Sequence, residues 1–155
     1  MDRPQRELAG LDSPVGPLTV IIDGEAISGL RWGAAPSPLS DLGHSAVAQL
    51  TEYFGGNRRA FDLPLAPRAS AFQARFYDAL CAIPFGETRT YGDIAADLGV
   101  SAQAIGQACG ANPIPILIPC HRVLAANGLG GFSGGGGIEA KVALLRLEGA
   151  AGLLI

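Results

Sequence analysis

Hydrophobic residues in the first third of the chain predict a β-hairpin followed by one helix. Leu18–Ile22 is a short apolar run, Asp23-Gly24 is a turn signal, and Ile27–Trp32 is a second run. The two runs are expected to pair as antiparallel strands. Apolar residues then recur at the helical period, with Ser40 as the expected N-cap and Gly55-Gly56 as the end. The apolar face of this helix comprises Leu42, Val47, Leu50 and Phe54.

A last strand and a linker are expected to close this first part of the chain. Phe61–Leu65 is interpreted as the strand, and Pro64 and Pro67 mark the linker. The pattern changes to helical spacing from Ser70 onward. We therefore expect one domain at residues 1–67 and a second at residues 68–155.

The second part of the chain predicts three consecutive helices. The first has the apolar face Phe72, Phe76, Leu80 and Ile83 and ends at Pro84. Thr90, followed three residues later by Asp93, is a capping-box-like start for the next, which ends at Gly99. Ser101 then caps a helix of small residues that runs to about Cys109. Helix, glycine turn and helix form a helix-turn-helix outline, which is typical of DNA-binding proteins but is also common elsewhere.

A final helix is expected over Ile138–Leu147, with Ile138, Val142 and Leu145 on its inner face. Glu148 continues that face. A carboxylate at a helix C-terminus opposes the helix dipole, so Glu148 is expected to have a partner, and His121 is the one we choose.

Composition favours a globular protein. The chain has 155 residues, 48% hydrophobic and 16% charged, so it can furnish a buried core. No run approaches the roughly 18 apolar residues of a membrane span, and the N-terminus carries no signal-peptide pattern. We expect a cytoplasmic protein with no membrane partner.

Charge is distributed unevenly between the two parts. The net charge is -3. Residues 1–67 hold eight acids and five arginines, and residues 68–155 hold six residues of each sign. Any DNA contact by the second part is therefore expected to depend on helix N-termini, backbone amides and shape, with a weak dependence on salt.

The cysteines are expected to be reduced thiols. Cys81, Cys109 and Cys120 are odd in number, and their spacing fits neither a disulfide framework nor a zinc knuckle. Cys81 and Cys109 are interpreted as core residues. Because His44 and His121 are the only histidines, we predict no metal and no cofactor.

Cys120 is the candidate reactive centre. An apolar run expected to be buried and extended, Ile116–Ile118, leads through Pro119 to this thiol. A thiolate needs a base or a positive charge nearby, and His121 and Arg122 are its sequence neighbours. Cys120, His121 and Glu148 are thus predicted as nucleophile, base and orienter. The glycine-rich stretch 127–137 that follows is expected to be a loop whose amides approach a substrate.

The motifs around this centre resemble the O6-alkylguanine-DNA alkyltransferases, and the resemblance covers nearly the whole chain. The N-terminal part, residues 8–66, also looks like the N-terminal domain of that family. The C-terminal part carries the resemblance in Phe72-Gln73, the segment Ile83–Gly92, Asn112-Pro113, Ile118–Val123, Gly131–Gly135 and Leu144–Gly149.

The resemblance implies a fold and a reaction. It implies an α/β N-terminal domain, a small antiparallel sheet plus helix that is ribonuclease H-like, followed by a mostly α, winged-helix-like helix-turn-helix domain. It also implies DNA repair: Cys120 accepts an alkyl group from O6-alkylguanine in double-stranded DNA, after minor-groove contact and base flipping. The thioether product makes each molecule a single-turnover reagent, and a monomer is expected.

Individual roles follow from the resemblance, residue by residue. His121 would activate Cys120 through water, Glu148 would orient His121, Tyr91 would hydrogen-bond the base on its N3 side, and Asn112 would brace the loop before the site. The Ser133 amide would meet the O6 atom, and the carbonyls of Cys120 and Val123 would receive the exocyclic amine. The remaining predicted DNA-binding residues are Thr90, Ser101, Ala102, Gln103 and Arg122.

Three positions depart from the family pattern. Gln103 stands where an arginine usually fills the gap left by the flipped base, so weaker DNA capture or altered substrate preference is the hypothesis. Phe132 replaces a frequent tyrosine, and the glycine run 134–137 is longer than the expected two.

Two alternatives remain open at this point. The first is a lesion-binding protein without chemistry, against which the presence of Cys120 argues. The second is a Cys-His-Glu thiol hydrolase or redox enzyme, for which the triad alone would suffice.

Overall fold

A turn at Asp23 and Gly24 joins the two strands that the sequence predicts. β2 (Leu18–Asp23) pairs antiparallel with β3 (Ala26–Trp32), and Gly24 has a φ of +65°. Alternate residues of β2 are buried: Leu18, Val20 and Ile22. The hairpin is confirmed, and its buried side chains supply much of the core of the first unit.

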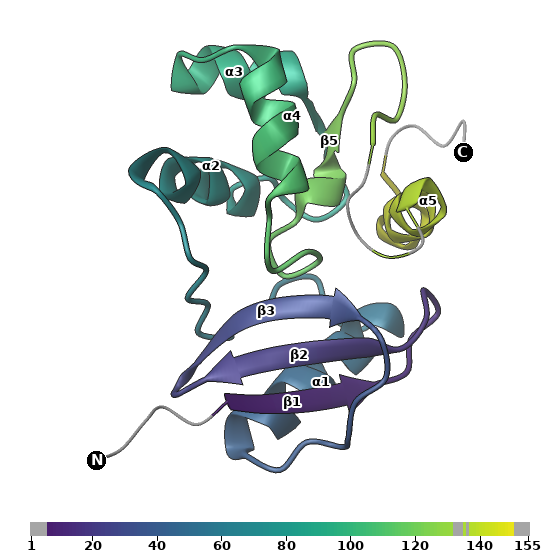
Figure 1. Cartoon of the computed structure of the whole chain (residues 1–155). Coiled ribbons are helices and arrows are strands. Elements are labelled where there is room, and N and C mark those ends of the chain that lie inside the picture. The colour runs from purple at the N-terminus through teal and green to yellow at the C-terminus, as the bar shows by residue number, and fades with distance from the viewer. Residues whose placement is uncertain (1–5, 132–134, 136, 151–155) are drawn as a thin grey trace. The chain divides into compact units, whose positions relative to one another are not determined.

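A third strand, which the sequence did not predict, completes this sheet. β1 (Arg6–Leu11) pairs antiparallel with β2, giving the order β1-β2-β3 (Figure 1). The strand escaped prediction because Ala9 alone of its residues is fully buried. Arg6 and Glu7 interrupt the apolar pattern by which a strand is recognised.

Helix α1 (Asp41–Phe54) packs against one face of the sheet (Figure 1). The Ser40 hydroxyl accepts a hydrogen bond from the Gly43 amide, and the helix ends at Gly55, as predicted. Ala46, Leu50 and Tyr53 are its buried residues besides Gly43.

The predicted strand at Phe61–Leu65 is wrong. Leu65 makes one isolated bridge, to Ile27, through bonds from the Ile27 amide to the Pro64 carbonyl and from the Ala66 amide to the Ile27 carbonyl. Pro64 has no amide hydrogen to donate, so the pairing does not extend into a ladder.

Helices α2, α3 and α4 confirm the helical prediction for the second unit. α2 spans Ala71–Cys81, α3 spans Tyr91–Leu98 and α4 spans Ala102–Gly110. Thr90 and Asp93 form a reciprocal capping box at the start of α3, and Gly99 ends it in the left-handed region. Ser101 caps α4 by accepting a bond from the Ala104 amide. The α3–Gly99–α4 arrangement is the expected helix-turn-helix.

The segment before Cys120 is a turn rather than an extended run. Ile116 has a φ of +74°, and the Ile118 amide donates to the Ile114 carbonyl at 2.9 Å. All three residues from Ile116 to Ile118 are buried, as expected. Pro113 and Pro115 have no amide hydrogen to donate, so this stretch cannot pair as a regular strand.

Two short strands link the reactive segment to the helix-turn-helix. η1 (Cys120–Arg122) is a single 3₁₀ turn, and β5 (Val123–Leu124) follows it. β5 pairs in parallel with β4 (Arg89–Thr90), which directly precedes α3. This pairing places the start of α3 beside the reactive segment.

Helix α5 (Gly137–Glu148) exists as expected, but with another inner face. Ile138 is 43% exposed, so its assignment to the core is wrong. The buried side of the helix is formed by Ala140, Lys141, Leu144, Leu145 and Glu148.

The three cysteines are free thiols, and they differ in burial. Cys120 is buried and Cys109 is intermediate, whereas Cys81 is exposed. The core assignment of Cys81 is wrong because Phe76, Tyr77 and Leu80 form the buried side of α2.

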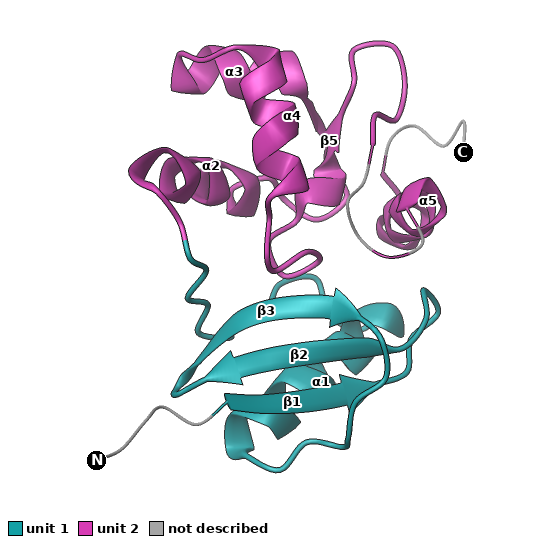
Figure 2. Ribbon diagram, in the orientation of Figure 1, with its two compact units in different colours: residues 1–68 teal, residues 69–155 magenta. Residues whose placement is uncertain are grey.

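Two compact units divide the chain, at Met1–Arg68 and Ala69–Ile155 (Figure 2). This structure, a computed structural model, describes residues 6–131, 135 and 137–150. Within that part no helix is long and apolar enough to cross a membrane. The expected fold class, a small antiparallel sheet with a helix followed by a mostly helical helix-turn-helix unit, is confirmed.

Candidate active site

Cys120 begins the 3₁₀ turn η1 and is only 4% exposed. Its amide donates to the Ile118 carbonyl at 2.8 Å, and its carbonyl accepts from the Val123 amide. These backbone bonds fix the Cα–Cβ direction of a thiol surrounded by protein. A nucleophile held in this way reacts only with a group delivered to it.

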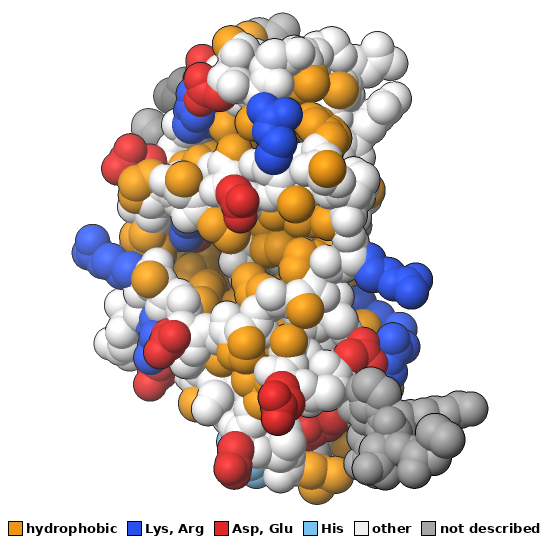
Figure 3. All heavy atoms as spheres, turned by 90° about the vertical axis from the view of Figure 1, so that its left-hand side faces the viewer, with side chains coloured by type: hydrophobic (Ala, Val, Ile, Leu, Met, Phe, Trp, Pro, Cys, Tyr) orange, Lys and Arg blue, Asp and Glu red, His pale blue; other side chains and the backbone are white. Residues whose placement is uncertain are grey.

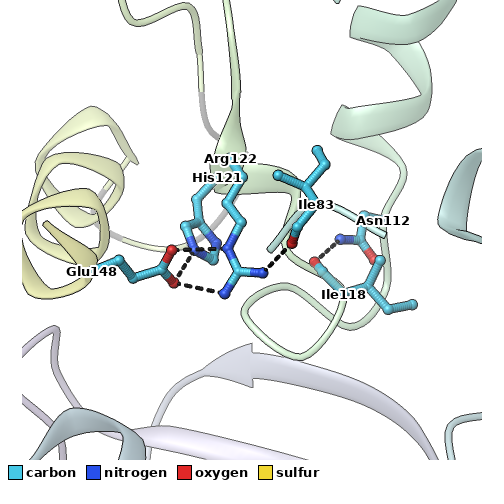
Figure 4. A network of polar contacts seen from close by, with 6 residues as sticks. All are labelled: Ile83, Asn112, Ile118, His121, Arg122 and Glu148. Atoms are coloured by element: carbon cyan, nitrogen blue, oxygen red, sulfur yellow. Dashed lines mark hydrogen bonds and ion pairs between the residues drawn. The ribbon is translucent and has the colours of Figure 1, made fainter. Parts of the chain in front are cut away.

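Asn112 braces the turn that precedes the cysteine (Figure 4). Its Nδ2 donates to the Ile118 carbonyl at 2.9 Å, and its Oδ1 accepts from the Ile114 amide at 3.0 Å. The same side chain also hydrogen-bonds the sulfur of Cys120, which lowers the pKa of the thiol. Asn112 therefore couples the shape of the turn to the reactive atom.

His121, Arg122 and Glu148 form a buried charged network (Figure 4). Nε2 of His121 lies 2.8 Å from Oε2 of Glu148. Arg122 donates to Glu148 from Nε at 2.8 Å and from Nη2 at 3.1 Å, and its Nη1 donates to the Ile83 carbonyl at 2.7 Å. The structure thus brings Glu148 to His121, and Arg122 supplies the opposite charge that a buried carboxylate requires.

The network determines which nitrogen of His121 can act as a base. Burial lowers the pKa of His121, Arg122 acts in the same direction, and the Glu148 carboxylate opposes both without outweighing the burial. The imidazole is therefore neutral near pH 7. Because Nε2 faces an anion, we assign its hydrogen there, which leaves the lone pair on Nδ1. Nδ1 is buried and has no hydrogen-bond partner, so it is available to take a proton.

Lys141 is a site residue that sequence reasoning missed. Its side chain is fully buried, and Nζ donates to the carbonyls of Val123 at 2.7 Å and Gly131 at 3.0 Å. Burial raises the pKa of the Cys120 thiol from its ordinary 9.0, whereas the Lys141 charge lowers it. Lysine is almost never fully buried without a reason. The signal was available, because Lys141 shares a helix face with Leu144, Leu145 and Glu148.

Tyr91, the first residue of α3, lies near the same cation. Lys141 Nζ is 5.9 Å from the centre of the Tyr91 ring. Burial raises the pKa of the Tyr91 hydroxyl, and a backbone hydrogen bond from Gly131 lowers it. A Cβ atom at Gly130 would lie 2.8 Å from that hydroxyl, and Gly130 has a φ of +70°, so glycine is required there. Tyr91 is thus held as a protonated donor.

The predicted DNA-binding residues of α4 are on its open side. Ser101, Ala102 and Gln103 are exposed, and so are Gly106 and Gln107. Ile105 and Ala108 form the buried side. A Cβ atom placed at Gly106 or Gly110 would meet nothing within 4 Å. Exposed residues at this spacing share one face, where glycine and alanine allow close approach of another molecule to the helix backbone.

The other predicted binding residues have mixed positions. The Thr90 hydroxyl is engaged in the capping box of α3. The side chain of Arg122 is 8% exposed, and its bonds go to Glu148 and Ile83 rather than outward. The Val123 carbonyl accepts from Lys141 and retains a second lone pair for a ligand. Ser133 and Phe132 lie outside the described residues.

On the face drawn in Figure 3, acidic and basic side chains are interspersed with hydrophobic ones and do not gather by sign. Among the described residues, no three His, Cys, Asp or Glu side chains lie together as a metal site would require.

Comparisons with known proteins identify relatives along most of the chain. Residues 71–150 match the family model of the 6-O-methylguanine DNA methyltransferase DNA binding domain, and residues 9–67 match that of its ribonuclease-like domain. A Mycobacterium tuberculosis protein named methylated-DNA--protein-cysteine methyltransferase is 44% identical over 153 residues, 89% of each chain.

Solved structures from the same organism are equally similar. The M. tuberculosis O6-methylguanine methyltransferase shares 42% identity with a TM-score of 0.82, covering 94% of this chain and 93% of that one. The M. tuberculosis OGT in complex with DNA shares 44% identity and a TM-score of 0.82, covering 92% of both chains.

Proposed function

The chain belongs to the 6-O-methylguanine DNA methyltransferase family, and we propose that it repairs DNA by transferring an alkyl group from O6-alkylguanine to Cys120. The observation that carries the assignment of this residue is that the buried Cys120 directly precedes His121, whose Nε2 lies 2.8 Å from Glu148 and whose Nδ1 is buried without a hydrogen-bond partner. Neither the lesion-sensor nor the hydrolase alternative is favoured.

The transfer is a displacement at carbon. The Cys120 sulfur forms a bond to the alkyl carbon while the bond from that carbon to guanine O6 breaks, and the electron pair remains on the guanine. The thiol proton passes through one water to Nδ1 of His121. Glu148 stabilises the resulting imidazolium, because a carboxylate at Nε2 favours the charged ring.

The leaving guanine carries the electron pair as an anion, which balances the positive charge of the His121 imidazolium. The Tyr91 hydroxyl, whose raised pKa keeps it protonated, donates a hydrogen bond to N3 of the base and stabilises this anion. The carbonyls of Cys120 and Val123 receive the exocyclic amine, and the Ser133 amide contacts O6. The thioether formed at Cys120 has no hydrolytic route in this site, so each molecule acts once.

DNA is bound through the helix-turn-helix. In this proposal a monomer places the exposed face of α4 in the minor groove of double-stranded DNA, and Gln103 occupies the space left by the flipped nucleotide. Ser101 and Ala102 contribute the N-terminus of α4, which suits a phosphate group. The small side chains of this face favour contact by shape. We place the reaction in the cytoplasm.

Intact-mass measurement tests the transfer. Incubation with an oligonucleotide carrying one O6-methylguanine should add one methyl group per protein, on the peptide that contains Cys120. The reaction should stop after one equivalent.

Matched variants locate the acceptor. Cys120→Ala should remain unmodified, whereas Cys81→Ala, which removes an exposed thiol, should react as the wild type does. Tight binding of the lesion with no added mass would instead support a sensor.

A further inference from the structure

Gln107 is a polar side chain of α4 to which the proposed function gives no role. It follows Gln103 by four residues, so the two side chains are neighbours on the same face of the helix. Both are exposed, and neither side-chain amide bonds another residue in the described part of the chain. Two amides that can bind a ligand therefore lie one helical turn apart.

The surface beside these two amides is open. Gly106 and Gly110 form the adjoining row of α4, and a Cβ atom at either position would meet nothing within 4 Å. Another molecule can therefore come close to the helix backbone at this face, within reach of both glutamines. Because α4 belongs to the DNA binding domain of the family, DNA is the molecule expected there.

Charge gives the second unit little attraction for DNA. No residue of α4 is charged, and the cations Arg122 and Lys141 are buried. Among residues 69–155, the arginines that reach the surface are Arg75, Arg89 and Arg146, whereas five carboxylates are exposed. The accessible charge of this unit is thus negative, so its affinity for a polyanion must come from neutral hydrogen bonds and close fit.

Resting on the function proposed above, we propose that Gln107 is a second DNA-contacting residue of α4 and hydrogen-bonds the edge of a base pair next to the lesion. In the minor groove an A·T pair presents only acceptors, whereas a G·C pair adds the donor N2 of guanine. An amide both donates and accepts, so Gln107 can bind either pair, and an arginine, which only donates, cannot. Gln107 thus supports binding whatever sequence surrounds the damaged guanine.

Equilibrium binding to short duplexes tests the proposal. The protein carries Cys120→Ala so that the lesion persists, and the O6-methylguanine is flanked either by A·T pairs or by G·C pairs. Gln107→Ala should weaken binding to both duplexes about fivefold, the loss expected for one neutral hydrogen bond. The slope of log affinity against log salt concentration should stay the same, because no charge is removed. Ser45→Ala, which removes an exposed hydroxyl from α1, should bind as the parent protein does.

Unchanged affinity of Gln107→Ala for both duplexes would overturn the proposal, and a loss confined to one of them would refute the sequence tolerance. Gln107→Glu is the second variant: it keeps the length of the side chain, loses the donor and adds a negative charge. It should bind more weakly than Gln107→Ala, and binding as tight as the parent's would also refute the contact. Because methyl transfer is not measured, a protein that binds DNA without repairing it would still give a clear result for Gln107.

Discussion

Nε2 of His121 lies 2.8 Å from Oε2 of Glu148, and both side chains are completely shielded from solvent. The two residues are 27 positions apart, so α5 must dock beside η1 before the pair exists. Arg122 pairs with the same carboxylate through Nε and Nη2. The orientation of the base thus depends on a charged network that is stable only while every member is present.

Glu148→Gln should destabilise the protein and weaken the reaction together. The change keeps the shape of the side chain but leaves the buried Arg122 guanidinium without its anion, at a cost of about 3–5 kcal/mol. Urea unfolding measures this loss, and single-turnover methyl transfer should slow as the support for the imidazolium is lost. Glu139→Gln, an exposed change in the first turn of the same helix, is the control. Equal stability of Glu148→Gln and wild type would contradict the network.

Asn112→Ala should loosen the turn before the nucleophile. The variant loses the bonds to the Ile118 carbonyl and the Ile114 amide; the carbonyl keeps its bond from the Cys120 amide, but the buried Ile114 amide is left unpaired. We expect about 1–3 kcal/mol of lost stability by urea unfolding, with a higher pKa of Cys120. Asn127→Ala, at an exposed loop position, should change neither quantity. If Asn112→Ala kept the stability of the wild type and the same pKa of Cys120, the turn would be shown to form without support from Asn112.

Lys141→Met should make the Cys120 thiol harder to ionise. The variant keeps a long side chain but removes the cation that opposes the effect of burial on the thiol. Methyl transfer at neutral pH should slow by roughly tenfold, corresponding to about one pKa unit, and the deficit should shrink as pH rises. Arg146→Met, which removes an exposed charge from α5, controls for general electrostatics. A deficit that stays constant with pH would point to misplacement of the Val123 and Gly131 carbonyls instead.

Stability should be greatest between about pH 6.5 and 9. Burial lowers the pKa of His121 from 6.5, so the unfolded chain takes up its proton first and stability falls as pH drops below that value. Burial raises the pKa of Cys120 from 9.0, so the unfolded chain loses its proton first and stability falls above that value. Chemical unfolding across pH measures both limits. Cys120→Ser should reduce the alkaline loss, and a wild-type-like loss in that variant would assign it to other groups.

Gln103→Arg should strengthen DNA binding. Gln103 is exposed at the start of α4, and a guanidinium there adds a cation with a planar face. The affinity for DNA should rise. If the new charge contacts a phosphate, the slope of log affinity against log salt concentration should become steeper by about one. Thr51→Arg, an exposed site of equal charge change on α1, is the control. If DNA affinity and repair rate were both unchanged, glutamine at position 103 would be shown to support DNA binding as well as arginine does.

Local pattern alone was sufficient for most elements of this fold. The hairpin, α1 and the helix-turn-helix follow from apolar spacing, Ser and Thr caps and glycine ends, all of which act within a few residues. β1 and the pair β4–β5 did not follow from it. Their pairing depends on strands that are distant in sequence, and their own residues carry little apolar pattern.

The same division holds for the active site. The sequence by itself determined that Cys120 follows a rigid proline segment, that His121 is its neighbour and that Glu148 requires a partner. Tertiary structure alone decided that Arg122 faces inward to Glu148 and that Lys141 places a charge near the thiol. The physical reason is that ionisation depends on desolvation and on charges within a few ångströms, and such neighbours are assembled only when α5 packs against the turn that carries Cys120.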